Sequence, residues 1–342
     1  MARFAVVGSG AWGTALAAHV ARLEHEVAMW AFEREVAEEI TQRHTNTPFL
    51  PDITLPDSIR ASHDAASVVA GAEVVVLVPP SGHMRAVSTA IAAAIPRDAI
   101  VVVATKGIEE GSLQLMSQVL AETMPRLEPE RLAFLSGPTF AREVARGLPT
   151  DVVVASSGMV AARKVQELVH SISMRVYSSA DPIGVQVGGA IKNVLAIATG
   201  ACDGLAFGTN ARAALITRGL AEITRLGVAL GADPLTFLGM AGVGDLVLTC
   251  TGELSRNRTL GIRIAEGADP AAYLARQRAV AEGFSTSAAA YELSRTLAVE
   301  MPITEQVYLV LHRGRPLLEA GRALLERSRK EELHGIRETP GS

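Results

Sequence analysis

The sequence predicts an α/β protein, in which a doubly wound parallel sheet is followed by an all-α domain. Two observations predict this fold class. Short valine-rich runs alternate with longer amphipathic stretches through the first half of the chain, and such runs stop after Asp181-Pro182. The 342 residues are enough for two hydrophobic cores. We therefore expect a first domain over residues 1–180, a helical domain over 181–330 and a tail over 331–342.

In the first domain, apolar runs are predicted as strands and the segments between them as helices. Unbroken valine runs are typical of strands buried on both faces, as in a parallel sheet between two helix layers. Their alternation with amphipathic segments is the βαβ pattern. The predicted strands are 4–8, 26–30, 74–79, 100–107, 132–137, 151–156 and 175–179, and the predicted helices include 13–23, 33–44, 84–94 and 112–124.

From about residue 183 to about residue 328 the pattern indicates helices separated by glycine clusters, with almost no strand signal. One helix is predicted over 183–200. Its segment "GGAIKNVLAIATG" carries a single charge, Lys192, within an apolar run. The tail "RKEELHGIRETPGS" is charged and loses its periodicity, so we expect its end to be disordered.

Composition excludes several classes of protein. Hydrophobic residues make up 49% and charged residues 20%, which is far from the composition of a disordered chain. The net charge of −4 gives no general reason to bind nucleic acid or a membrane surface. Cys202 and Cys250 match no disulfide or zinc motif, which favours free thiols in a reducing cytoplasm. We expect no metal, no signal peptide and no membrane span.

A glycine-rich turn follows the first predicted strand and opens the first predicted helix. Gly8 permits a tight turn, Gly10 lets the backbone approach a pyrophosphate, and Gly13 lets the helix pack on the strand. The helix N-terminus then offers free N–H groups to phosphates. In this position the pattern indicates a Rossmann-type dinucleotide-binding domain rather than a turn with a structural role alone.

The choice between NAD and NADP depends on the end of the second strand. NAD enzymes carry a ribose-binding carboxylate there, and NADP enzymes carry an arginine nearby. Here Ala31 stands at the usual carboxylate position, and Phe32, Glu33 and Arg34 follow. The pattern favours NAD(H) and leaves NADP(H) open.

Polar residues follow two neighbouring predicted strands at their carboxyl ends, where chemistry gathers in open α/β sheets. Lys106 ends the run "VVVATKG", and Gly137 and Thr139 stand in "SGPTFA". Surface lysines without a functional role lie more often on helix faces than directly after buried strand residues. We therefore expect these residues to face one crevice, with a surface lysine as the alternative.

If the helix over 183–200 lines that crevice, Lys192 is partly desolvated and its pKa is drawn down towards neutrality. Such a lysine can exchange a proton with a substrate oxygen. The alternative is a lysine that extends its stem across apolar surface. Asp245 and Thr249 stand one helical turn apart, and an aspartate near Lys192 would hold its position and charge.

The segment "SRNR" places a compact set of hydrogen-bond donors in four consecutive residues, Ser255 to Arg258. Guanidinium groups bind phosphate in bidentate fashion, so the set suits a phosphate dianion. From this motif alone, a solvated basic patch is an equal alternative.

Together these motifs resemble the NAD-dependent glycerol-3-phosphate dehydrogenase family. The family pattern is matched in order, from about residue 3 to about residue 320, by "GSGAWGTALA", "ATKG", "SGPTFA", "GGAIKNVLAIA", "CDGLAFGTNARAALITRGLAE", "GDLVLTCTGELSRNR" and "VAEG". The resemblance implies a bacterial-type enzyme that transfers hydride reversibly between a nicotinamide cofactor and C2 of dihydroxyacetone phosphate. The product, sn-glycerol 3-phosphate, is the backbone of membrane phospholipids.

The resemblance also implies roles for individual residues. Lys192 resembles the family's proton donor and acceptor, Lys106 its partner at the substrate, and Asp245 the carboxylate that supports the lysine. Further substrate contacts are implied for Gly137, Thr139, Thr249, Ser255, Arg256 and Asn257. Cofactor contacts are implied for Gly8, Gly10, Ala11, Trp12, Gly13, Phe32, Lys106, Ala141, Arg256, Val280 and Glu282.

The chain departs from the family pattern at two places. "WAFE" stands where many bacterial members have a basic residue, and it is closer to "WVFE" of NAD-specific eukaryotic relatives. Ala11 replaces a commoner serine, so a hydroxyl contact to the cofactor is lost. We expect a cytoplasmic enzyme with a small-molecule substrate, and a homodimer is left open.

Two other interpretations stay open. Another Rossmann-plus-helical dehydrogenase, of the ketopantoate reductase or hydroxyacid type, would not require the "SRNR" cluster. A nucleotide-sensing protein without catalysis would be favoured by the loss of Lys106 or Lys192, and both are present.

Overall fold

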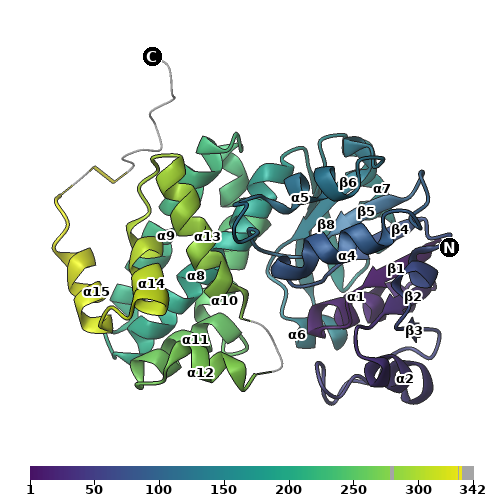
Figure 1. The fold of residues 1–342 in the computed structure, drawn as a ribbon, viewed down its shortest axis with the longest axis horizontal. Coiled ribbons are helices and arrows are strands. Elements are labelled where there is room, and N and C mark those ends of the chain that lie inside the picture. Colours follow the sequence, from purple (N-terminus) through teal and green to yellow (C-terminus); the bar gives the residue numbers. More distant parts are fainter. Residues whose placement is uncertain (278–280, 330, 333–342) are drawn as a thin grey trace. The chain divides into compact units, whose positions relative to one another are not determined.

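The computed structural model describes residues 1–277, 281–329 and 331–332, and the chain forms two compact units (Figure 1). The first unit comprises Met1–Lys106 and Met116–Pro182. The second begins again at Ile183 and also takes in Gly107–Leu115, a segment from the first half of the chain. Ile108 and Leu115 of that segment belong to the apolar core of the second unit. The predicted domain bounds, 1–180 and 181–330 with a tail over 331–342, stay a prediction.

The first unit is built on an eight-stranded sheet with the strand order β3-β2-β1-β4-β5-β6-β7-β8. The strands are β1 (Arg3–Val7), β2 (Glu26–Trp30), β3 (Arg60–Ser62), β4 (Val74–Leu77), β5 (Ile100–Val103), β6 (Leu132–Ser136), β7 (Thr150–Ala155) and β8 (Met174–Ser179). The predicted α/β fold class is confirmed. The missed strand β3 has only three residues at the sheet edge and no buried apolar run, so it left no strand pattern.

The sheet is not parallel throughout, because β7 runs antiparallel to β6 while β8 runs parallel to β7. The connection from β6 to β7 contains a single short helix, α6 (Ala141–Ala145), which packs on α1 (Ala11–Arg22). Five helical residues span about 7.5 Å, whereas a five-residue strand spans about 16 Å. This helix is therefore too short to carry the chain back along β6, and β7 returns in the opposite direction.

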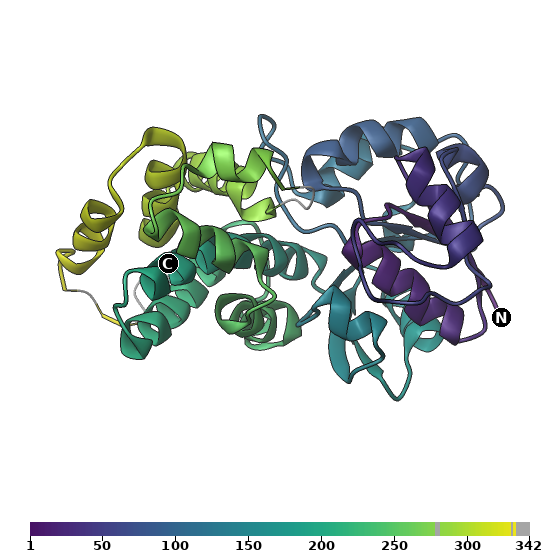
Figure 2. The same cartoon turned by 90° about the horizontal axis from the view of Figure 1, so that it is seen from below.

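Helices cover the sheet of the first unit (Figure 2). Besides α1 and α6 they are α2 (Arg34–Arg43), α3 (Ala65–Val69), α4 (Met84–Ile91), α5 (Met116–Thr123) and α7 (Met159–Val169), with 3₁₀ turns at Ser81–His83 and Pro129–Arg131. Four of these helices were predicted. The helix predicted over 112–124 begins only at Met116, because the residues before it belong to the second unit.

Every described element of the second unit from Ile183 onward is helical, as predicted. The elements are α8 (Pro182–Gly204), α9 (Thr209–Ala229), η3 (Pro234–Leu238), the π-helical η4 (Met240–Gly244), α10 (Asp245–Thr251), α11 (Arg256–Ala265), α12 (Pro270–Ala275), α13 (Glu282–Thr296), α14 (Pro302–Arg313) and α15 (Leu317–Leu325). By length and hydropathy α8 could cross a membrane, but 94% of its apolar window is buried inside the protein. A helix in the core of a folded domain can have the same length and hydropathy as a membrane-spanning helix.

A buried carboxylate joins two helices of the second unit. Glu222 of α9 accepts hydrogen bonds from the backbone N–H groups of Ile303 (2.6 Å) and Thr304 (3.1 Å), and from the Thr304 hydroxyl (2.9 Å). It therefore caps the start of α14. Burial raises the pKa of Glu222 to about 7, and these hydrogen bonds oppose the rise.

This raised pKa predicts a pH-dependent stability. Between about pH 4.5 and pH 7 the unfolded chain releases the Glu222 proton and the folded chain keeps it, so the free energy of unfolding falls as pH rises, by roughly 3 kcal/mol at most. Glu222→Gln should remove this fall, while Glu292→Gln at an exposed position should keep it. Denaturant unfolding at a series of pH values measures both. The same pH slope in Glu222→Gln as in the unmodified protein would contradict the prediction.

Candidate active site

The three glycines of the turn between β1 and α1 differ in what surrounds them. Gly8 has φ of 121°, and a Cβ at Gly13 would lie 2.0 Å from the carbonyl oxygen of Gly8. The fold itself therefore requires these two glycines. A Cβ at Gly10 would meet no atom within 4 Å. No packing among the described residues requires Gly10, and the open space beside it leaves room for a ligand to approach the backbone.

The start of α1 is suited to an anion. Gly10 is its N-cap residue in extended conformation and makes no side-chain cap, and the first turn contains no acidic residue. The N–H groups of that turn are therefore available to a phosphate. The indole Nε1 of Trp12 is buried and has no hydrogen-bond partner among the described residues. Ala11 and Trp12 pack against the apolar core of the first unit.

At the end of β2 the side chains after Ala31 differ in direction. Phe32 is 79% exposed and lies edge-to-face with Trp30. Arg34 contacts the imidazole Nε2 of His63 at 2.8 Å, and Trp30 donates to the carbonyl oxygen of His63 at 3.1 Å. The arginine that follows the strand is thus held at His63, beyond the end of β3.

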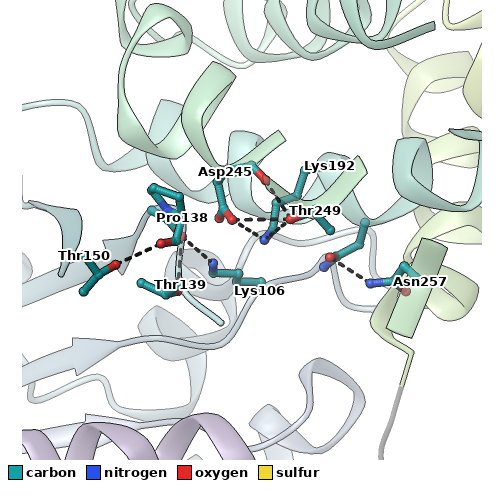
Figure 3. A network of polar contacts seen from close by, with 10 residues as sticks. Lys106, Pro138, Thr139, Thr150, Lys192, Asp245, Thr249 and Asn257 are labelled. Atoms are coloured by element: carbon teal, nitrogen blue, oxygen red, sulfur yellow. Dashed lines mark hydrogen bonds and ion pairs between the residues drawn. The ribbon is translucent and has the colours of Figure 1, made fainter. Parts of the chain in front are cut away.

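The carboxyl ends of β5 and β6 bring together three predicted site residues (Figure 3). The ammonium of Lys106 donates to the carbonyl oxygen of Gly137 at 3.4 Å, and the hydroxyl of Thr139 donates to the same oxygen at 3.1 Å. Gly137 has φ of 143°, and a Cβ there would lie 2.9 Å from the carbonyl oxygen of Asp151. Lys106 thus follows β5 with its ammonium beside this turn, and that these residues face one crevice stays a prediction.

Lys192 is buried in the second unit beside a carboxylate (Figure 3). Its Nζ lies 2.5 Å from Oδ1 of Asp245 and 2.9 Å from the hydroxyl oxygen of Thr249. The side chains of Lys192 and Asp245 are 8% and 0% exposed. The predicted proximity of the aspartate to the lysine is confirmed. Since an unpaired buried charge is costly, the close carboxylate is what allows an ammonium at this depth.

The close approach of neighbouring segments to α8 positions Lys192 and Asp245. A Cβ at Gly188 of α8 would lie 2.3 Å from the carbonyl oxygen of Ala241, and one at Gly200 would lie 1.9 Å from that of Arg258. A side chain at Gly188 would push away the turn that leads into α10, and one at Gly200 would push away the first turn of α11. The π-helical turn Met240–Gly244 then delivers Asp245 to the first turn of α10, a kind of irregularity found often at functional sites.

The segment "SRNR" is only partly the free donor set that the sequence suggested. Ser255 caps α11 by accepting from the N–H of Arg258 at 3.2 Å, and Arg258 pairs with Asp203 at 2.7 Å. Arg258 is thus engaged in a structural ion pair. Arg256 is an exposed residue as a whole, and its guanidinium makes no hydrogen bond within the described part of the chain. Desolvation lowers the pKa of Arg256, and the Glu282 carboxylate raises it in part.

Asn193 is a candidate residue to which sequence analysis assigned no role. Its side-chain oxygen accepts from Asn257 at 2.9 Å, and the Asn257 oxygen accepts from the N–H of Gly283 at 3.0 Å. This chain of amides links α8, α11 and α13 next to Lys192. The only signal for it in the sequence was an amide beside the lysine in an apolar helix.

The predicted site residues therefore fall into two sets. The first unit holds Gly8, Gly10, Ala11, Trp12, Gly13, Phe32, Lys106, Gly137, Thr139 and Ala141, and the second holds Lys192, Asp245, Thr249, Ser255, Arg256, Asn257 and Glu282. Val280 lies outside the described residues. That the two sets form one site stays a prediction. Among the described residues, no group of three His, Cys, Asp or Glu side chains could hold a metal ion.

Comparison with known proteins identifies the family. Models of the NAD-dependent glycerol-3-phosphate dehydrogenase N-terminus and C-terminus match residues 3–162 and 181–322. Glycerol-3-phosphate dehydrogenase [NAD(P)+] of Geobacter sp. (strain M21) is 49% identical over 96% of this chain and 98% of its own length. The crystal structure of glycerol-3-phosphate dehydrogenase from Coxiella burnetii is 38% identical, covers 95% of this chain and 99% of its own, and has a TM-score of 0.91. This chain belongs to the NAD-dependent glycerol-3-phosphate dehydrogenase family.

Proposed function

We propose that this protein catalyses the reversible, NAD(P)H-dependent reduction of dihydroxyacetone phosphate to sn-glycerol 3-phosphate, which supplies the backbone of phospholipids. The observation that carries the proposal is the buried Lys192 held by Asp245 and Thr249 in a chain of this family. The first unit is proposed as the cofactor-binding domain and the second as the catalytic domain. Two buried, unpaired cysteines support a location in the reducing cytoplasm.

The glycine-rich turn fits a dinucleotide. The open space at Gly10 and the uncapped first turn of α1 suit a pyrophosphate. The nicotinamide, when bound, supplies the hydride that adds to C2 of the ketone. Residues proposed to hold the cofactor are Gly8, Gly10, Ala11, Trp12, Gly13, Phe32, Lys106, Ala141, Arg256, Val280 and Glu282.

Lys192 is proposed as the acid of the reduction. Negative charge develops on the ketone oxygen as C2 is reduced, and the ammonium donates its proton to that oxygen. Asp245 keeps the lysine in its charged form before the transfer and orients it towards the substrate. In the reverse direction the neutral amine accepts the hydroxyl proton. Lys106, held against the turn at Gly137, is proposed to position the substrate at the strand ends.

The start of α11 is proposed to bind the substrate phosphate. Ser255, Arg256 and Asn257 lie at its N-terminus, where backbone N–H groups and the helix dipole favour an anion. The guanidinium of Arg256 adds a charge-assisted hydrogen bond. Arg258 takes no part in this site, because its guanidinium pairs with Asp203.

An oxidation assay tests the proposed activity. Loss of NADH or NADPH absorbance is followed with dihydroxyacetone phosphate as the acceptor, with each cofactor in turn. We expect turnover with dihydroxyacetone phosphate and little with ketopantoate or simple 2-oxo acids. Turnover with those acids alone would favour another dehydrogenase of this fold. Cofactor binding without turnover on any of them would favour a nucleotide-sensing protein.

Cofactor preference is predicted from the end of β2. A 2′-phosphate needs a cation, whereas Phe32 is apolar, Glu33 is repulsive and Arg34 is held at His63. We expect NADH to be used at least as well as NADPH. Phe32→Arg should shift the ratio of kcat/KM towards NADPH, and the exposure of Phe32 makes the change compatible with folding. Phe32→Gln is the uncharged control. A tenfold or greater preference of the unmodified enzyme for NADPH would show that this interpretation is wrong and would implicate Arg34.

A further inference from the structure

A fully buried asparagine lies against the glycine-rich turn. Asn46 is 0% exposed and belongs to the loop between α2 and β3. Its amide nitrogen donates to the carbonyl oxygen of Ser9 and to the hydroxyl oxygen of Thr14, both at 2.8 Å. The Thr14 hydroxyl donates to the same Ser9 oxygen at 3.1 Å. Three hydrogen bonds thus join Asn46, Ser9 and Thr14 in a closed set, which we call the Ser9 clamp.

The Ser9 clamp determines where the next N–H group points. A trans peptide is planar, so the Ser9 carbonyl and the Gly10 N–H point in opposite directions. Holding the carbonyl against Asn46 and Thr14 turns the Gly10 N–H away from them. Donors on the carbonyl oxygen also polarise the peptide and strengthen its N–H as a donor.

The loop that carries Asn46 is anchored independently of the turn. Glu39 of α2 accepts from the hydroxyl of Thr45 at 2.8 Å and from the hydroxyl of Thr47 at 2.6 Å. It also accepts from the N–H of Thr47 at 3.0 Å. The residues on both sides of Asn46 are therefore tied to one carboxylate, and the hydrogen bond from the Thr47 hydroxyl lowers the pKa of Glu39. Contacts within the protein itself therefore hold the loop that carries Asn46.

We propose that Asn46 is a positioning residue for cofactor binding, which holds the Ser9–Gly10 peptide so that the Gly10 N–H meets the pyrophosphate. The inference rests on the proposed function, because it takes a dinucleotide as the ligand of the turn. Asn46 belongs to the first unit, and the proposed proton donor, Lys192, belongs to the second. Its loss should therefore weaken binding of the pyrophosphate and leave the chemical step intact.

Binding measurements test the proposal without any turnover. Asn46→Ala should raise the Kd of NADH, followed by its fluorescence, by about tenfold, which corresponds to one ordinary hydrogen bond of about 1.4 kcal/mol. The Kd of ADP-ribose, followed by calorimetry, should rise by the same factor, because it retains the pyrophosphate and lacks the nicotinamide. In the assay, KM for NADH should rise while kcat at saturating NADH stays near that of the unmodified enzyme.

A matched control separates positioning from loss of stability. Thr41 forms a similar link nearby, since its hydroxyl donates to Ala61 O at 3.1 Å and accepts from Ala61 N at 2.9 Å, but it does not touch the glycine-rich turn. Thr41→Val should lower the melting temperature and leave both Kd values unchanged. Thr14→Val, which keeps the bond from Asn46 to Ser9, should raise them about two- to threefold.

Unchanged Kd values for NADH and ADP-ribose in Asn46→Ala would overturn the proposal. A rise of both values in Thr41→Val as large as that in Asn46→Ala would overturn it too. If Asn46→Ala does not fold, unchanged Kd values in Thr14→Val would overturn it. ADP-ribose binding needs no substrate. A protein that fails to reduce dihydroxyacetone phosphate but loses ADP-ribose affinity in Asn46→Ala would therefore contradict the proposed function and support the role of Asn46.

Discussion

Lys192→Ala is expected to lower kcat for dihydroxyacetone phosphate by on the order of 10² to 10⁴, the range typical for loss of a general acid. The lysine is the cation held by Asp245 and Thr249. In the proposed reduction, its removal takes away both the proton and the positive charge beside the ketone oxygen. Because the glycine-rich turn lies in the other unit, the Kd of NADH should change little. Steady-state kinetics and a fluorescence titration measure the two effects.

The control for this variant addresses the buried carboxylate. Removal of Lys192 leaves Asp245 uncompensated at 0% exposure, and an unpaired buried charge costs several kcal/mol. The double variant Lys192→Met/Asp245→Asn removes both charges and should recover thermal stability without recovering turnover. Near-normal turnover of Lys192→Ala across the pH range would show that the lysine has a structural role only.

Arg256→Ala is expected to lower kcat/KM for dihydroxyacetone phosphate by about 10- to 100-fold, since a hydrogen bond to a charged group contributes roughly 1.5–3 kcal/mol. Activity on unphosphorylated dihydroxyacetone, already poor, should change little, because that substrate lacks the phosphate that Arg256 is proposed to bind. The ratio of kcat/KM for the two substrates is the measurement.

Arg258→Ala is the matched control for Arg256. The two arginines lie in the same turn of α11, but Arg258 pairs with Asp203 at 2.7 Å. Its loss should lower stability and reduce activity on both substrates alike. Equal losses on both substrates in Arg256→Ala would instead show that Arg256 serves the cofactor or the fold.

The sequence alone was enough to predict the fold class and the proximity of Asp245 to Lys192. The unbroken run "VVVL" forms β4, which is buried along its whole length. Burial of a strand on both faces can therefore be predicted from its apolar composition. The glycine pattern is equally local, because Gly8 and Gly13 are required by the turn in which they stand. Asp245 and Thr249, one helical turn apart, share a helix face and meet Lys192 as their spacing suggested.

Tertiary structure decided what local pattern cannot encode. The valine run of β7 would look the same in a parallel and in an antiparallel strand. Its antiparallel direction follows from the short connection through α6. Arg256 and Arg258 look alike in "SRNR", yet Asp203, more than fifty residues earlier, pairs with Arg258 and not with Arg256. Asn46 stands in no recognisable pattern, because its side-chain hydrogen bonds are to Ser9 and Thr14, 37 and 32 residues away. Burial and turn conformation depend on a few neighbouring residues, so they can be predicted from local sequence patterns. Contacts between residues far apart in the sequence form only when packing brings the two segments together, so no local pattern predicts them.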